Sequence, residues 1–273
     1  MIKEASIFGC GWLGVPLASE LNKRGWGVKG STTTPSKRPF LDSFLKASFL
    51  VDIDNLPENI GEFLSSDVLI ISLPPKLNRR DKPFEFLEKL ALFREEVRKS
   101  PLTKVLYISS TSVYGENQGK VDEDTAPKPN SVRGEVLLLA EEEVLSWSKK
   151  VTVLRFGGLV GKKRHPSFSL SGKKNLKNGK NPINLIHQED CIEIILKIIE
   201  KDKWGMTFNG VAPFHPSKED YYCEVCNYFS LPSPSYGEST CLSGKEVYGK
   251  LVEDILEHKF IYPNLGPSLF ERK

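Results

Sequence analysis

The sequence predicts an α/β fold in which helices cover both faces of a parallel sheet. Short apolar segments alternate along the chain with longer segments of helical periodicity. Strands that are apolar on both faces are typical of a buried parallel sheet. A glycine-rich turn directly follows the first apolar segment. We therefore predict a doubly wound parallel sheet, with a smaller lobe formed by the C-terminal part of the chain.

The predicted elements follow one another in a regular order. Strands are expected at residues 5–8, 26–30, 48–53, 67–73, 104–109, 151–156 and 204–211. Helices are expected from the glycine turn to residue 21, and at 84–99, 135–147, 191–200, 217–229 and 245–257. Residues 161–182 are expected to be rich in loops and basic, and residues 260–270 to be irregular. We divide the chain into a sheet domain, residues 1–160, and a lobe, residues 161–273, from which residues 183–211 return to the sheet domain.

Composition limits the classes of protein to which the chain can belong. Its 273 residues are 39% hydrophobic and 27% charged, which is ordinary for a soluble globular protein. A net charge of +3 is too small to indicate a nucleic-acid or membrane partner by itself. No apolar run reaches the ~20 residues of a membrane span, and the N-terminus shows no signal-peptide pattern. Five cysteines, an odd number, predict no disulfide framework, so we expect a cytoplasmic protein.

Two further clusters are expected to be structural. Cys223 and Cys226 form a single C-x-x-C within a helical pattern, without a second pair, so we expect core residues and no metal site. The acidic run at residues 141–143 is expected to be a solvated helix face.

The glycine turn contains the pattern G-x-G-x-x-G at Gly9, Gly11 and Gly14, between a predicted strand and a predicted helix. In a dinucleotide-binding turn the first glycine permits the tight bend and the second lets the backbone approach a pyrophosphate. The third lets the helix pack closely on the strand. We therefore predict that residues 9–14, which are Gly9, Cys10, Gly11, Trp12, Leu13 and Gly14, bind a nicotinamide dinucleotide. The alternative is a plain strand-to-helix turn.

The end of the second strand favours NADP over NAD. An acidic residue about 20 positions past the motif would hold the ribose 2′-hydroxyl of NAD. The chain has hydroxyl side chains there, with Thr32 and Thr33 among them, followed by Lys37 and Arg38. Hydroxyls and cations suit a 2′-phosphate. The alternative is that the two cations are solvated surface residues and that selectivity is weak.

Segments along nearly the whole chain resemble the short-chain dehydrogenase/reductase superfamily in its extended form, the NAD(P)-dependent epimerase/dehydratase family that acts on nucleotide sugars. The resemblance is carried by the glycine turn, SDVLIISLPP, YISSTSVYG, VDEDTAPKP, LRFGGLVG and INLIHQEDC. It implies that Asp52 and Ile53 lie near the adenine, and that Leu73, Pro74 and Pro75 line the cofactor beside the nicotinamide ribose.

The resemblance also implies a catalytic hydroxyl at Ser110, although the assignment could shift by one position. The family's proton-transfer pair, Y-x-x-x-K, is absent. Its two positions are occupied by Gly134 and Leu138, and no tyrosine of this chain has a lysine four residues later. In the family the lysine and the oxidised nicotinamide lower the tyrosine pKa from near 10 so that the phenol can transfer a proton. The chain therefore resembles an atypical branch.

Other residues could act on the substrate. His165, expected in a loop over the site, and Tyr114 are candidates for proton transfer, although the resemblance implies packing for Tyr114. Arg133, at the head of the helix that lacks the pair, is an alternative electrophile. Lys163 and Arg164 begin a stretch without acids, residues 162–180, which the resemblance places over a nucleotide diphosphate. The alternative for this stretch is a solvated lysine-rich loop.

These observations predict an NADP-dependent epimerase- or dehydratase-like oxidoreductase. Its substrate would be a small polar molecule or a nucleotide sugar, and its proton donor would be non-standard. The alternative is a non-catalytic NADP-binding sensor or regulator, which the missing tyrosine and lysine favour. Assembly as a homodimer is left open.

Overall fold

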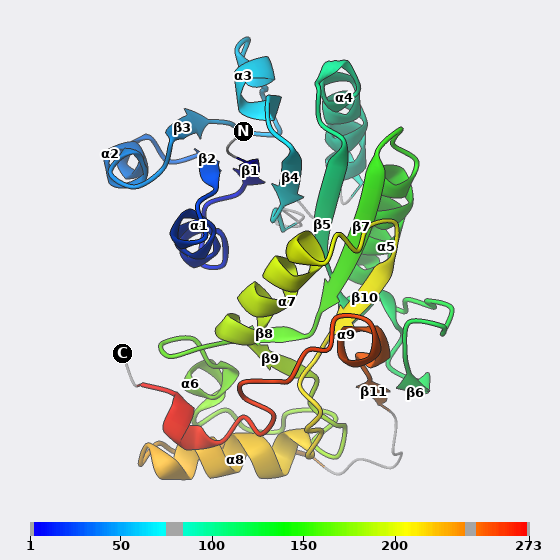
Figure 1. The fold of residues 1–273 in the computed structure, drawn as a ribbon. Coiled ribbons are helices and arrows are strands. Elements are labelled where there is room, and N and C mark those ends of the chain that lie inside the picture. Colours follow the sequence, from blue (N-terminus) through cyan, green and yellow to red (C-terminus); the bar gives the residue numbers. More distant parts are fainter. Residues whose placement is uncertain (1–2, 75–83, 238–243, 272–273) are drawn as a thin grey trace. The chain divides into compact units, whose positions relative to one another are not determined.

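The computed structural model describes residues 3–74, 84–237 and 244–271. Their main feature is a seven-stranded sheet with the order β10-β7-β5-β4-β1-β2-β3 (Figure 1). Its strands are β1 (Glu4–Phe8), β2 (Gly27–Thr32), β3 (Ala47–Leu50), β4 (Val68–Ile71), β5 (Lys104–Ser110), β7 (Lys150–Phe156) and β10 (Thr207–Gly210). The pairs β1–β2, β2–β3, β1–β4 and β4–β5 are all parallel, as predicted.

The order of the strands reverses beside β1. The chain runs outward from β1 to β2 and β3, and then returns to place β4 on the other side of β1. In open α/β sheets ligands bind at such a switch point, beyond the carboxyl ends of the strands. The topology therefore selects the ends of β1, β2 and β4 as the place to look for a site.

Helices cover both faces of the sheet around β1. Phe8 packs in a core with buried residues of α3 (Ile60–Leu64), α4 (Glu85–Lys99) and α5 (Val132–Leu145). Successive side chains of a strand point to opposite faces. Ile7 accordingly lies on the other face, where α1 (Gly14–Lys23) begins, and a Cβ on Gly14 would lie 3.3 Å from the Ile7 Cγ2. The predicted doubly wound arrangement is confirmed.

The chain forms two compact units that alternate along the sequence. The first contains residues 1–109, 132–154 and 196–207, and the second contains residues 110–131, 155–195 and 208–273. The predicted boundary after residue 160 stays a prediction, and so does the division of the chain into a sheet domain and a lobe.

The second unit is built mainly from short elements. Its helices are α6 (Pro166–Leu170), α8 (Lys218–Tyr228), α9 (Lys250–Asp254) and the larger part of α7 (Gln188–Glu200). Two small parallel sheets pair β6 (Gly119–Val121) with β11 (Lys245–Val247), and β8 (Gly158–Val160) with β9 (Leu185–His187). The short remaining elements are α2 (Arg38–Asp42) in the first unit and the 3-10 helices η1 (Pro35–Lys37), η2 (Thr111–Val113) and η3 (Pro267–Leu269).

One predicted segment is wrong. The helix expected at 245–257 is instead β11 followed by α9, because Lys245 and Val247 are buried on one side of a strand that pairs with β6. Gly249 separates the two elements, and a Cβ there would lie 2.4 Å from the Asn209 carbonyl oxygen. Residues 161–182, expected to be rich in loops, contain the five-residue helix α6. Among the described residues, none of the helices has the length and apolar character that crossing a membrane requires.

Candidate functional site

The first unit has a pocket of about 500 Å³ at the ends of β1, β2, β3 and β4. It lies at the switch point that the strand order selects. The predicted cofactor residues among its lining are Gly9, Cys10, Gly11, Thr32, Thr33, Lys37, Asp52, Ile53, Leu73 and Pro74. Pro75 lies outside the described residues.

The three glycines of the turn have three different environments. Gly9 has φ +111°, and a Cβ there would lie 2.7 Å from the Ser72 carbonyl oxygen. A Cβ on Gly14 would lie 2.3 Å from the Gly9 carbonyl oxygen. Gly11 lines the pocket, and a Cβ there would meet none of the described protein atoms within 4 Å. Because neither backbone strain nor packing requires a glycine at position 11, its bare backbone fits the close approach of a diphosphate.

The other members of the turn support it. Cys10 is buried, and burial raises the pKa of its thiol to about 12, so it is a neutral packing group. Leu13 is also buried, at the start of α1, and Trp12 is half-buried. The Ser31 hydroxyl accepts a hydrogen bond from the Gly9 amide at 3.0 Å, which ties the turn to β2.

Hydroxyls and one lysine line the pocket beyond β2. Thr33, Thr34 and Lys37 are exposed lining residues. Arg38, by contrast, donates to the Ser48 hydroxyl at 3.3 Å and to the Ser48 carbonyl oxygen at 3.1 Å. Of the two predicted cations, Lys37 is therefore the one that the pocket presents to a ligand.

An ion-pair cluster borders the part of the pocket that follows β3. The Lys89 ammonium lies 2.6 Å from an Asp54 oxygen and 2.8 Å from a Glu85 oxygen. Hydrogen bonds to Asp54 and then Glu85 raise the pKa of Lys89. This cluster joins α4 to the loop that carries Asp52. Sequence reasoning missed it because Asp54 and α4 belong to separate segments of the chain, beyond the reach of any local pattern.

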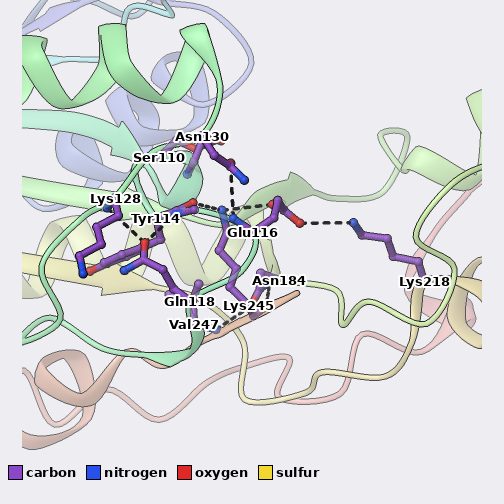
Figure 2. Close-up of polar contacts among 12 residues, drawn as sticks. Ser110, Tyr114, Glu116, Gln118, Lys128, Asn130, Asn184, Lys218, Lys245 and Val247 are labelled. Atoms are coloured by element: carbon purple, nitrogen blue, oxygen red, sulfur yellow. Dashed lines mark hydrogen bonds and ion pairs between the residues drawn. The ribbon is translucent and has the colours of Figure 1, made fainter. Parts of the chain in front are cut away.

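The second unit contains Ser110 at the start of a turn. Ser110 caps η2, where its hydroxyl oxygen accepts from the Ser112 amide at 3.2 Å and lies 3.1 Å from the Ser112 hydroxyl. Figure 2 shows that Ser110 lies beside a network of side-chain contacts made by the residues that follow it. Ser110 is half-buried rather than enclosed. The geometry is suited to presenting a hydroxyl at the end of a strand.

The neighbouring serine has a different environment. The Ser109 hydroxyl donates to Glu141 at 2.5 Å, and Glu141 is only 1% exposed. The expectation that residues 141–143 form a solvated helix face is therefore wrong for Glu141, because this turn of α5 faces the core. Carboxylates are rarely buried unless they have a partner, so an acidic run is normally expected to face water. The partner of Glu141 lies 32 residues earlier, and sequence reasoning therefore missed the pair.

Tyr114 is buried and its hydroxyl is fully engaged. The hydroxyl accepts from the Arg155 guanidinium at 2.8 Å and lies 2.9 Å from the Asp122 carbonyl oxygen, to which it donates. Burial is the largest influence on the phenol and raises its pKa. These contacts suit the packing role that the resemblance implies.

His165 is buried at the end of a loop, where it caps the start of α6, and its expected place over the site stays a prediction. It is 5% exposed, and its Nδ1 accepts from the Ser167 amide at 3.2 Å at the start of α6. Its Nε2 therefore carries the proton, directed at the Tyr221 hydroxyl 3.1 Å away. Burial lowers the pKa of the ring to about 4. Both nitrogens are occupied by protein contacts.

The remaining candidates are on the surface. Arg133, Lys163 and Arg164 are exposed, whereas Gly134 is buried and Leu138 is half-buried in α5. Within the basic stretch, Lys162 lies 3.3 Å from Glu271 and Lys180 lies 3.1 Å from Glu219. In the described part of the chain, no group of His, Cys, Asp and Glu side chains could hold a metal ion.

Two side chains that sequence reasoning missed hold the backbone of residues 110–116, the serine turn. Lys245 comes from β11 and contacts the Tyr114 carbonyl oxygen. Gln118 accepts from the Gly115 amide at 2.6 Å and from the Lys128 amide at 3.1 Å. The Gln118 contact with Gly115 is local, three residues away, whereas no local pattern identifies Lys245, because its contact depends on how distant segments pack.

Comparison with protein families and with curated proteins gives consistent matches. Residues 7–209 match the model of the NAD dependent epimerase/dehydratase family. Protein YeeZ of Escherichia coli (strain K12) is 32% identical over 277 residues, which cover 96% of this chain and 97% of that protein. An uncharacterized UDP-glucose epimerase, YtcB of Bacillus subtilis (strain 168), is 26% identical over 129 residues, which cover 42% of this chain and 41% of that protein.

Solved structures share the fold. MoeE5 in complex with UDP-glucose and NAD superposes with a TM-score of 0.80 at 19% identity, over 98% of this chain and 96% of that chain. UDP-glucuronic acid 4-epimerase from Bacillus cereus in complex with NAD gives a TM-score of 0.78 at 21% identity, over 97% of this chain and 95% of that chain. At these identities the likeness establishes the predicted fold.

Proposed function

Since the chain belongs to the NAD dependent epimerase/dehydratase family, we propose that it binds a nicotinamide dinucleotide and acts on a nucleotide sugar or a similar small polar substrate. The observation that carries the proposal is Gly11. It lines the pocket at the switch point, and the space before its backbone is open although nothing in the protein requires a glycine there.

Each part of the pocket has a proposed role in holding the cofactor. The backbone of residues 9–14 and the N-terminus of α1 would hold the diphosphate. Asp52 and Ile53 would contact the adenine, and residues 73–75 would contact the nicotinamide ribose. When bound, the cofactor supplies a group that accepts and returns hydride.

We propose a preference for NADP. The support is the chemistry beyond β2, where Thr33, Thr34 and Lys37 line the pocket and residues 33–37 contain no carboxylate. A lysine and two hydroxyls can bind a 2′-phosphate. The MoeE5 and Bacillus cereus epimerase structures are complexes with NAD. The preference is therefore a point on which this chain would differ from them.

On the substrate, we propose that the Ser110 hydroxyl hydrogen-bonds the reacting carbonyl or alcohol. Arg133, Lys163 and Arg164 would contact its anionic part, which suits their exposure and charge. The proton donor would be a group other than the family tyrosine, because Gly134 and Leu138 occupy the two positions of that pair. We do not propose His165 for this role, because both of its nitrogens have protein partners.

Gly134 and Leu138, at the positions of the family's tyrosine and lysine, favour a second candidate function. Without the tyrosine and lysine, the chain could bind the dinucleotide as a sensor or regulator and carry out no chemistry. The two functions predict the same cofactor affinity and differ in turnover alone.

Titration of the purified protein with NADPH and with NADH tests the cofactor proposal, using thermal shift and tryptophan-to-nicotinamide energy transfer. We expect saturable binding, tighter for NADPH. Lys37→Ala should weaken NADPH about tenfold, the loss of one charge-assisted contact, and leave NADH within about twofold. Arg38→Ala is a matched variant that should act through Ser48 and alter both affinities together. Absence of binding of either cofactor would refute the proposal.

A panel of nucleotide sugars then separates enzyme from sensor. Product analysis by chromatography, together with the absorbance of the reduced cofactor, should detect conversion of at least one sugar. Cofactor binding with no conversion across the panel would favour the sensor. We also propose a reducing, cytoplasmic environment, since the described cysteines form no disulfide. We further propose that the protein forms a homodimer, and light scattering tests this.

A further inference from the structure

The backbone after Ser110 is held by side chains that lie outside residues 110–116 (Figure 2). The Tyr114 carbonyl oxygen accepts from the Lys245 ammonium. The Gly115 amide donates to the Gln118 side chain at 2.6 Å, and the Glu116 amide donates to the Asn130 side chain at 3.4 Å. Three consecutive residues thus each have a polar backbone group fixed by a side chain, so the turn depends on contacts that its own sequence does not provide.

Lys245 differs from the other supports because it places an ammonium group in the interior. Its side chain is 8% exposed, and burial is the largest influence that lowers its pKa. The Glu116 carboxylate, 3.3 Å from Nζ, provides partial compensation. Burying an ammonium is costly unless it is paired and hydrogen-bonded. A methionine could fill similar space at a lower desolvation cost, so packing alone does not account for a lysine.

The backbone of Lys245 is itself fixed. The Asn184 side chain donates to the Lys245 carbonyl oxygen and accepts from the Val247 amide, both at 2.8 Å. Lys245 also pairs with Gly119 in the parallel ladder of β11 and β6. The ammonium therefore extends from a fixed base to the carbonyl at the end of the turn.

We propose that Lys245 is a positioning residue, which fixes the Ser110–Tyr114 turn through the Tyr114 carbonyl and thereby sets the direction of the Ser110 hydroxyl. Its use in a reaction rests on the proposed function, whereas its effect on the turn does not. Lys218, which lies 4.0 Å from the same Glu116 carboxylate, provides a matched comparison within the cluster.

Hydrogen–deuterium exchange of the full-length protein tests the proposal. Lys245→Met should raise exchange of the peptide covering residues 110–118 about tenfold, while peptides from β1 to β4 keep their wild-type rates. Lys218→Met should leave the same peptide within about twofold of wild type. Lys245→Arg, which retains a cationic donor, should recover most of the protection. Melting temperature and NADPH affinity, measured on the same samples, check that each variant is folded.

Steady-state kinetics with UDP-glucose as the probe adds the functional measurement. Lys245→Met should lower kcat at least about tenfold with KM within about threefold, and Lys245→Arg should restore part of kcat. Unchanged exchange at 110–118 in folded Lys245→Met would overturn the proposal. Two other outcomes would also overturn it, because both would indicate general destabilisation. One is exchange that rises equally in all peptides of Lys245→Met, and the other is that Lys245→Arg folds whereas Lys245→Met does not. If wild type does not convert UDP-glucose, the substrate proposal fails for that sugar, and exchange still decides the role of Lys245.

Discussion

The glycine loop at residues 9–14 and the serine turn at residues 110–116 both follow strands of one sheet, yet they are stabilised in opposite ways. The loop is shaped by the absence of side chains, since a Cβ on Gly9 or Gly14 would overlap backbone atoms. The turn is stabilised by side chains from farther along the chain, with Lys245 and Asn130 bound to its backbone.

This difference decides how each region can be recognised. A loop whose conformation depends on missing side chains has a fixed local spacing, which is visible in a single sequence. A turn held by distant residues has no such spacing, because many residue types at many positions could supply the same hydrogen bonds. The two regions also differ in chemistry, because the loop presents a backbone without a side chain at Gly11 and the turn presents the Ser110 hydroxyl.

The largest expected effect comes from filling the tightest position of the loop. Gly14→Ala should destabilise the protein by about 3 kcal/mol or more, because the added methyl would lie 2.3 Å from the Gly9 carbonyl oxygen, which is backbone and cannot rotate away. Cofactor binding should be lost as well. Urea unfolding measures the first effect, and NADPH titration measures the second. If Gly14→Ala were as stable as wild type, the close approach to the Gly9 carbonyl oxygen would be contradicted.

Acid should distinguish the two units. All four histidines of the chain belong to the second unit, and burial lowers the pKa of His165 to about 4 and also lowers that of His187. Between the unfolded value of about 6.5 and the folded value, the unfolded chain binds more protons. Stability from His165 is therefore complete above about pH 6.5 and falls by about 1.4 kcal/mol per unit as the pH drops towards 4.

Urea unfolding at pH 7, 6 and 5 measures this slope. His165→Asn keeps an acceptor for the Ser167 amide and removes the ionisable ring, so its slope should be shallower. Exchange at pH 5 should open peptides of the second unit before those of the first. Equal slopes in the variant and wild type would exclude His165 as a source of the acid sensitivity.

The smallest effect on stability is expected at Gly11, where a substitution should change cofactor binding and leave the free energy of unfolding nearly unchanged. Gly11→Ala should alter the free energy of unfolding by less than about 0.5 kcal/mol, because the methyl meets no protein atom within 4 Å. It should weaken NADPH about tenfold, since the methyl would obstruct a diphosphate that approaches the backbone. Gly61→Ala, in α3 and equally open, is the matched control and should leave NADPH affinity unchanged. Unchanged affinity in Gly11→Ala would remove the observation on which the proposed function rests.

Most of the fold could be predicted because it depends on local periodicity. The strands β1, β4, β5 and β7 differ from the predicted segments by at most two residues at each end, since each is a short apolar run. The failures occur where pairing decides the structure. The segment Lys245–Val247 has no strong apolar alternation and becomes a strand because β6 is available to pair with it.

The candidate site divides in the same way. Gly9 and Gly14 could be identified because their spacing reflects a steric requirement of the fold, and Gly11 because it completes the motif. Lys37 could be identified by its position after β2. Lys245 could not be identified, since its partner Tyr114 lies 131 residues away. Glu141 was misjudged because an acidic run normally faces water, and only the packing of α5 shows that this carboxylate is enclosed.

Asp190 gives the last stretch of the described chain a particular importance. Its carboxylate is fully buried, and it accepts from the His258 ring at 3.0 Å, the Ile261 amide at 2.7 Å and the Tyr262 amide at 3.1 Å. Progressive shortening from the C-terminus should consequently not weaken the protein in even increments. Trimming back to residue 263 would remove the buried Leu265 and Phe270 but leave the three donors in place, whereas trimming past residue 258 would also leave a buried carboxylate without any of them, so the steepest loss of stability should fall between those two points.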